Sequence, residues 1–179
     1  MKGVCGMRLF HVSEDSSIDI FNPRIPERED LDKSVGLVWA IDEKHLPNFM
    51  TPRDCPRVTY HIGEYTSEHD KEMFFSSPEI QHVVIIESNW FQTMKNTHLY
   101  LYEFAPEGFE VQDEIAGYYI TREAQKPIEK YIVNDLFEAL LKRNVELRII
   151  KNLWDISDKI KTTTLNWSIC RMGYAQPRL

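Results

Sequence analysis

The stretch THLYLYEF, residues 97–104, places two sets of side chains in alternation. His98, Tyr100, Tyr102 and Phe104 would share one face of an extended chain, because successive side chains in a strand point to opposite sides. Alternation of this kind is typical of a β-strand with one buried face. The stretch therefore predicts a sheet protein, and the neighbouring segments indicate which sheet architecture it belongs to.

Further short runs rich in β-branched and aromatic residues predict more strands. These runs are residues 8–12, 35–41, 58–62, 82–87, 117–121, 128–133 and 145–150. Asn134 and Asp135 are good caps for a helix that continues through Arg143, and shorter helices are expected at residues 42–50 and 152–160. Residues 22–33 and 63–78 are expected to be loops, and residues 162–172 fit either a strand or a helix.

The predicted strands do not alternate regularly with long helices, so a doubly wound parallel sheet is disfavoured. We expect an α+β fold with a single twisted, mostly antiparallel strand core and a few short helices. The 179 residues are enough for one self-sufficient core, and a single domain over residues 1–179 is expected.

The composition limits the classes of partner. The chain has 21 Lys and Arg against 28 Asp and Glu, a net charge of −7. This balance disfavours a general nucleic-acid-binding protein and leaves room for a local basic pocket. The longest aliphatic run, Val83 to Ile86, is far too short to span a membrane. Cys5, Cys55 and Cys170 are an odd number of widely spaced cysteines, which favours reduced thiols and a cytoplasmic protein.

The segment FMTPRDCPR, residues 49–57, combines two prolines with Arg53 and Arg57. Proline restricts the backbone, so the segment predicts a stiff loop that presents guanidinium groups. Arg24 follows another proline. Arginine suits bidentate recognition of phosphate or carboxylate, so these residues predict a pocket for a small anionic ligand. The alternative is that Arg53 and Arg57 neutralise nearby acids such as Asp54.

A metal cofactor is not expected. Five residues separate Cys55 from His61, and this spacing matches none of the usual structural zinc units. A small metalloprotein that uses Cys55 and His61 stays open as an alternative function.

A series of short motifs runs through most of the chain. In order they are LFHVS at residues 9–13, FNP at 21–23, LVWAID at 37–42, HLYLYEF at 98–104, PEGFE at 106–110, YYITREA at 118–124 and PI at 127–128. This order resembles the small bacterial ADP-ribosyltransferases, particularly the rifampicin-modifying kind, whose fold is shared with RNA 2′-phosphotransferases. The resemblance extends over residues 8–133, and each matching piece is short.

The resemblance implies an ADP-ribosyltransferase-like fold and a site for NAD or a related nucleotide. In such a site His11 would hydrogen-bond a ribose hydroxyl, Ser13 would shape the pocket, and Trp39 would lie near the nicotinamide. Asp113 or Glu114 would be the catalytic carboxylate. A carboxylate stabilises the positive charge that builds on the sugar, and it can align or deprotonate the nucleophile. The cations available for the phosphates would be Arg24, Arg53 and Arg57.

The same residues fit a purely structural interpretation. Histidines at strand ends are often hydrogen-bonded, tryptophans often belong to cores, and loop acids are mostly solvated. The glycine that follows the histidine in the family is Val12 here. Besides the metalloprotein alternative, two functions therefore stay open, a NAD-dependent ADP-ribosyltransferase or a non-catalytic module that keeps the fold and binds a small anion or a protein.

Overall fold

The computed structural model describes residues 6–26 and 32–178 of the chain. The fold is α+β, with mostly antiparallel strands in two sheets and a few short helices. The chain divides into two compact units, which are unit 1 (Met1–Leu46 and Leu99–Ile132) and unit 2 (Pro47–His98 and Val133–Leu179). The expected α+β class is confirmed, and the strands form two sheets where the sequence predicted one core. The single domain over residues 1–179 stays a prediction.

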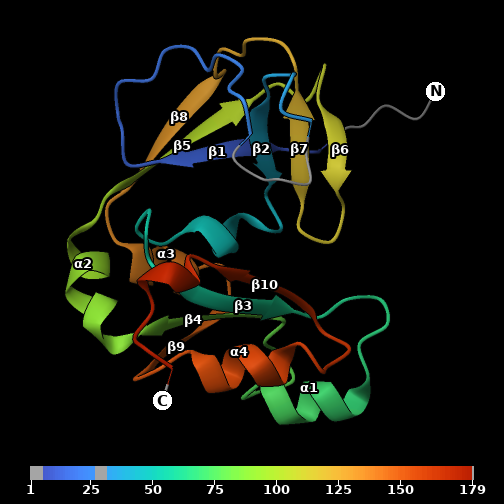
Figure 1. Cartoon of the computed structure of the whole chain (residues 1–179), viewed down its shortest axis with the longest axis vertical. Helices are drawn as coiled ribbons and strands as arrows, with labels where there is room; N and C mark the ends of the chain where they lie inside the picture. Colours follow the sequence, from blue (N-terminus) through green and yellow to red (C-terminus); the bar gives the residue numbers. More distant parts are fainter. Residues whose placement is uncertain (1–5, 27–31, 179) are drawn as a thin grey trace. The chain divides into compact units, whose positions relative to one another are not determined.

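Unit 1 is built on a six-stranded sheet with the order β6-β7-β2-β1-β5-β8 (Figure 1). Its strands are β1 (Leu9–Ser13), β2 (Val38–Asp42), β5 (Leu99–Phe104), β6 (Glu110–Asp113), β7 (Tyr118–Thr121) and β8 (Glu129–Val133). β1 pairs antiparallel with β2 and β5, and β7 pairs antiparallel with β2 and β6. The strand expected from the alternation at residues 97–104 is therefore β5, which lies inside this sheet.

One face of this sheet forms the core of unit 1. Leu9, Val38, Ala40, Tyr102 and Phe104 are buried there, and Phe21 packs on them. We call it the Phe21 face. His11 lies opposite Tyr102 in the β1–β5 register, so the alternation of strand side chains places His11 on the Phe21 face as well. The aromatic face predicted for residues 97–104 is thus part of a core.

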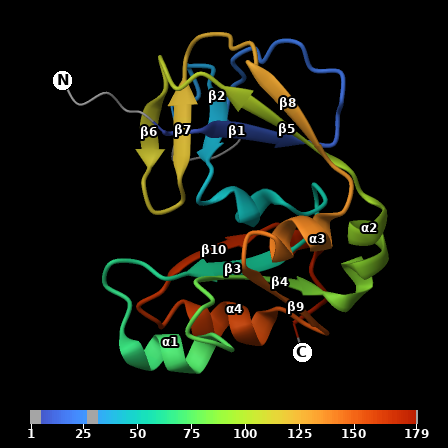
Figure 2. The same cartoon turned by 180° about the vertical axis from the view of Figure 1, so that it is seen from behind.

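Unit 2 is built on a four-stranded sheet with the order β10-β3-β4-β9. The strands are β3 (Arg57–His61), β4 (His82–Glu87), β9 (Val145–Ile150) and β10 (Asn166–Cys170), and only the β4–β9 pair among them is parallel. The α-helices are α1 (Glu68–Phe74), α2 (Phe91–Asn96), α3 (Leu136–Leu141) and α4 (Trp154–Ile160), with 3₁₀ turns at 46–49, 88–90 and 172–174. α1 and α4 lie on one side of the sheet and α3 on the other (Figures 1 and 2).

Several local predictions are confirmed and others are wrong. Asp135 caps α3 by accepting a hydrogen bond from the amide of Glu138, as the sequence predicted. Asp42 accepts one from the amide of His45, although the following helix is only a short 3₁₀ turn. α1 lies where a loop was expected, β6 was not predicted, and the ambiguous C-terminal segment contains β10.

Two further predictions concern thiols and membranes. Cys55 and Cys170 are free thiols, and Cys5 lies outside the described residues. Within the described ranges, no helix is both long and apolar enough to cross a membrane.

A buried carboxylate joins the end of β4 to two other segments of unit 2. Glu87 is 0% exposed. Its Oε1 accepts from the amide of Leu153, at the start of α4, and its Oε2 accepts from the amide of Gln176 near the C-terminus. The distances are 3.1 Å and 2.9 Å. A buried carboxylate is tolerated only when such donors satisfy it, so Glu87 ties α4 and the C-terminal segment to the sheet.

Replacement of Glu87 by Ala should therefore strongly destabilise the protein. The Leu153 and Gln176 amides would lose their acceptor, and the expected loss in free energy of unfolding is about 3 kcal/mol. Glu87→Gln should lose less, because one amide oxygen remains. Urea unfolding measures both variants against Glu79→Ala, an exposed glutamate whose removal should cost less than about 0.5 kcal/mol. Equal stability of Glu87→Ala and Glu79→Ala would contradict this role.

Candidate functional site

His11 is held by the neighbouring strand. Its Nδ1 lies 3.1 Å from the backbone oxygen of Trp39. A carbonyl oxygen only accepts, so Nδ1 must carry the proton and donate it. The ring of Phe21 packs against the imidazole, with centroids 4.7 Å apart. Phe21 itself meets the rings of Tyr102 and Phe104 edge-on, so the imidazole sits at the border of the aromatic core.

The environment of His11 favours the neutral imidazole. Burial lowers the pKa of His11 below its usual value, and the positive charge of Arg24 lowers it further, against the hydrogen bond to Trp39, which raises it. With Nδ1 protonated and the ring neutral, Nε2 is a hydrogen-bond acceptor. A half-buried acceptor beside a cation suits a ligand that carries both hydroxyl groups and negative charge.

Arg24 and Ser13 belong to the same part of unit 1. Arg24 forms an isolated antiparallel bridge with Leu37, just before β2, and its side chain is exposed. Ser13 lies two residues beyond His11, and its Oγ accepts a hydrogen bond from the amide of Asp15 at 3.1 Å. The hydroxyl of Tyr102 donates to the backbone oxygen of Asp15 at 2.7 Å. The same hydroxyl accepts from the amide of Ile18, so Tyr102, which lies opposite His11 in the β1–β5 register, holds the 13–18 loop.

The ring of Trp39 does not join this group. In the β2–β7 register Trp39 is adjacent to Ala40, which lies on the Phe21 face, so its side chain points to the opposite face. There it meets Tyr118 edge-on, with centroids 5.7 Å apart. Trp39 contributes its backbone carbonyl to the His11 site, and its indole lies elsewhere.

The two acids of the predicted catalytic position have different environments. Asp113 ends β6, and its carboxylate accepts a hydrogen bond from the amide of Ala116 at 3.0 Å, within the β6–β7 turn. Glu114 is exposed in that turn. Its charge helps to raise the pKa of Tyr119, after the larger effects of burial and of Asp42. Tyr119 pairs with Ala40, so its side chain lies on the Phe21 face.

Arg53 and Arg57 belong to unit 2. Arg57 is buried, in contrast to the presented guanidinium that the sequence predicted. Its Nε donates to the oxygen of Asn48 at 2.6 Å and its Nη1 to the oxygen of Cys55 at 3.0 Å. The guanidinium also lies 5.3 Å from the ring centre of Phe49. Arg57 therefore shapes the loop that precedes β3, whereas Arg53 is exposed on it.

The sequence did not single out one histidine of unit 1, His45, because its polar surroundings in DEKH are typical of a surface residue. His45 is 4% exposed, and its Nδ1 lies 2.6 Å from the Oδ1 of Asp42. Asp42 and His45 are three residues apart in DEKH, and this spacing could have revealed the pair. An aspartate that begins a turn commonly accepts a hydrogen bond from the amide of the residue three positions later. The same geometry brings the side chain of the third residue to the carboxylate.

The residues of the metalloprotein alternative are not brought together as a ligand set. Burial raises the pKa of the Cys55 thiol to about 12, and its Sγ lies beside the oxygen of Pro56. His61 pairs across the strands with His82, and its Nε2 lies 3.4 Å from the amide of Asn166. Among residues 6–26 and 32–178, no three His, Cys, Asp or Glu side chains could hold a metal ion together.

The comparisons with known proteins add one finding. The model of a family of unknown function, DUF6886, matches residues 10–175. The chain belongs to the DUF6886 family. The DUF6886 match covers parts of both units and includes every predicted site residue from His11 to Glu114. Searches of curated proteins and of solved structures found no match.

The lowered pKa of His11 predicts a pH dependence of stability. The unfolded chain takes up a proton at the ordinary histidine pKa of about 6.5, while the folded chain resists protonation at His11. Stability should therefore fall as the pH drops below about 6.5 toward the folded-state pKa. His11→Gln should show a shallower fall than the unchanged protein, measured by urea unfolding at pH 5 to 8.

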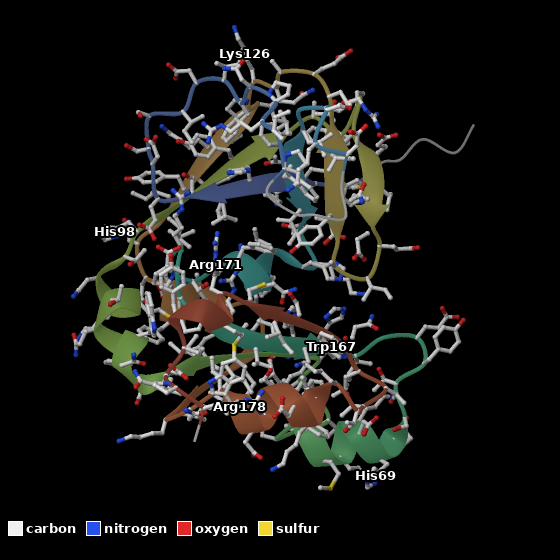
Figure 3. All side chains as sticks on the ribbon, in the orientation of Figure 1. His69, His98, Lys126, Trp167, Arg171 and Arg178 are labelled. Atoms are coloured by element: carbon white, nitrogen blue, oxygen red, sulfur yellow. The ribbon has the colours of Figure 1, made fainter. Side chains whose placement is uncertain are left out.

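His69 provides the matched control, because it is exposed on α1 (Figure 3). His69→Gln should keep the slope of the unchanged protein. If His11→Gln kept that slope as well, the inference of a neutral, buried imidazole would be wrong.

Proposed function

We propose that unit 1 binds NAD or an ADP-ribose-type nucleotide at His11, and that the chain is a cytoplasmic enzyme with an ADP-ribosyltransferase-like fold. The observation that carries this proposal is the hydrogen bond that fixes the imidazole of His11, a ring whose pKa burial lowers. The Nε2 of such a ring accepts a hydrogen bond from a hydroxyl group, which a ribose supplies. Its orientation is set before the ligand arrives, so little ordering cost opposes binding.

Arg24 supports the nucleotide as the class of ligand. Its positive charge contributes to the lowered pKa of His11, and its guanidinium would bind a phosphate of a nucleotide held at the imidazole. An overall charge of −7 does not oppose this, because only one local cation is needed for a small anion. The proposal relies on Arg24, since Arg53 and Arg57 belong to unit 2.

The proposed reaction is cleavage of the bond between nicotinamide and ribose, with transfer of ADP-ribose to an acceptor. Nicotinamide leaves with the electron pair of the broken bond, and an acceptor oxygen forms the new bond to C1′. A carboxylate of the β6–β7 turn would stabilise the positive sugar and take the acceptor's proton. The alternative function, a non-catalytic module that binds a small anion or a protein partner, fits the use of Asp113 within its own turn.

Calorimetric titration with NAD and with ADP-ribose tests the proposal. The unchanged protein should bind at least one of them, and His11→Ala should bind about tenfold more weakly, as expected for one lost hydrogen bond of about 1.4 kcal/mol. Arg24→Ala should weaken binding and make it less dependent on salt. His69→Ala is the control and should bind normally.

The outcomes separate the two functions. Binding with release of nicotinamide from NAD supports the transferase. Binding of ADP-ribose without any release from NAD supports the non-catalytic module. An absence of heat with both ligands at millimolar concentration would contradict the binding of NAD or an ADP-ribose-type nucleotide at His11.

A further inference from the structure

The end of β2 carries a compact cluster that the proposed function has not used. Asp42 is the last residue of the strand, and its Oδ1 accepts from both the amide and the Nδ1 of His45, at 2.8 Å and 2.6 Å. Burial raises the pKa of Asp42, but the hydrogen bonds and charge of His45 lower it by more, so the net shift is downward. Asp42 is therefore a carboxylate that holds the His45 ring in one orientation.

The His45 ring packs directly on the β6–β7 turn. Gly117 in this turn has a φ of +72°, and a Cβ built on it would lie 2.2 Å from the Nδ1 of His45. The amide of Asp42 also donates to the backbone oxygen of Gly117 at 3.0 Å. Only glycine fits both the backbone conformation and the contact. Asp42 and His45 together thus fix the position of this turn against the end of β2.

The turn held in this way contains both candidate acids. Asp113 is occupied within the turn, since its carboxylate accepts from the amide of Ala116. Glu114 is the acid whose charge acts on Tyr119, and Asp42 acts on the same phenol. Tyr119 pairs with Ala40, and Leu9 pairs with Asp42, so both side chains share the face that carries His11. Since Asp113 is hydrogen-bonded within the turn and Glu114 is exposed in it, Glu114 is the acid of the turn that is available to a ligand on the proposed nucleotide face.

We propose that Asp42 and His45 are positioning residues, a clamp that places Glu114 as the catalytic acid of unit 1. This inference rests on the proposed function. In the simplest reaction, hydrolysis of NAD, the bond from C1′ to the nicotinamide nitrogen breaks and nicotinamide leaves with the electron pair. A water oxygen forms the new bond to C1′, and its proton passes to the Glu114 carboxylate and then to solvent. The clamp acts on the geometry of this step and not on binding of NAD.

The first measurement tests the clamp and does not depend on an activity assay. Hydrogen exchange should show faster exchange at residues 114–118 in His45→Phe, which keeps a ring but loses the Nδ1 donor, and in Gly117→Ala. His45→Asn offers a donor near the same position and should restore most of the protection. Circular dichroism confirms that each variant is folded. Unchanged exchange in both His45→Phe and Gly117→Ala would overturn the clamp, whether or not the protein binds NAD.

The second measurement tests the catalytic part through nicotinamide release from NAD by the full chain. Glu114→Gln and His45→Phe should lower kcat at least about tenfold with little change in KM, because a displaced group loses transition-state contact but not ground-state binding. His45→Asn should recover part of kcat. Asp113→Asn, whose amide oxygen can still accept from Ala116, should lose less activity than Glu114→Gln. The control is Glu107→Gln, an exposed glutamate outside the turn.

The failures are distinguishable. A protein that neither binds nor cleaves NAD overturns the proposed function and the assignment of Glu114, while hydrogen exchange still decides the clamp. If the protein cleaves NAD, and His45→Phe raises KM but leaves kcat unchanged, the positioning role is overturned. Equal losses in Asp113→Asn and Glu114→Gln overturn the choice of acid.

Discussion

The hydrogen bond from His11 Nδ1 to the Trp39 carbonyl is the contact on which the account of unit 1 depends. It crosses from β1 to the neighbouring β2 and fixes the tautomer of a ring that burial keeps neutral. A free imidazole would rotate and would expose either nitrogen to a ligand. Here Nδ1 donates its proton to the backbone oxygen of Trp39, so Nε2 is left as an acceptor whose direction is fixed.

The pleat of the sheet divides the predicted site residues between two faces. His11, Asp42 and Tyr119 belong to the Phe21 face, whereas the Trp39 indole meets Tyr118 on the other side. A register shift of one residue would exchange these sets, so the burial of Leu9, Ala40 and Tyr102 is what keeps His11 in place. The candidate site of unit 1 is therefore a property of one sheet face and its covering loops.

Much of the local structure was predictable from the sequence. β4 stands out because its four central residues, Val83 to Ile86, are all apolar and β-branched, and α3 because Asp135 and an apolar stripe coincide. α1 was missed because its surface is polar, although Ser67 and Asp70 form a visible cap. The separation into two sheets was not predictable, since β10 pairs with β3 across more than a hundred residues and nothing local encodes that contact.

The site was predictable only in part, for the same reason. His11 and Arg24 were recognised as separate signals, and the effect of the Arg24 charge on the pKa of His11 is a product of folding. The burial of Arg57 and the Asp42–His45 pair became visible only in the fold.

Nitrogen-15 NMR of the His11 ring tests the central claim most directly. We predict a proton on Nδ1, none on Nε2 at pH 7, and a shift of the Nε2 resonance when ADP-ribose is added. A proton on Nε2, or a charged ring at that pH, would contradict the account.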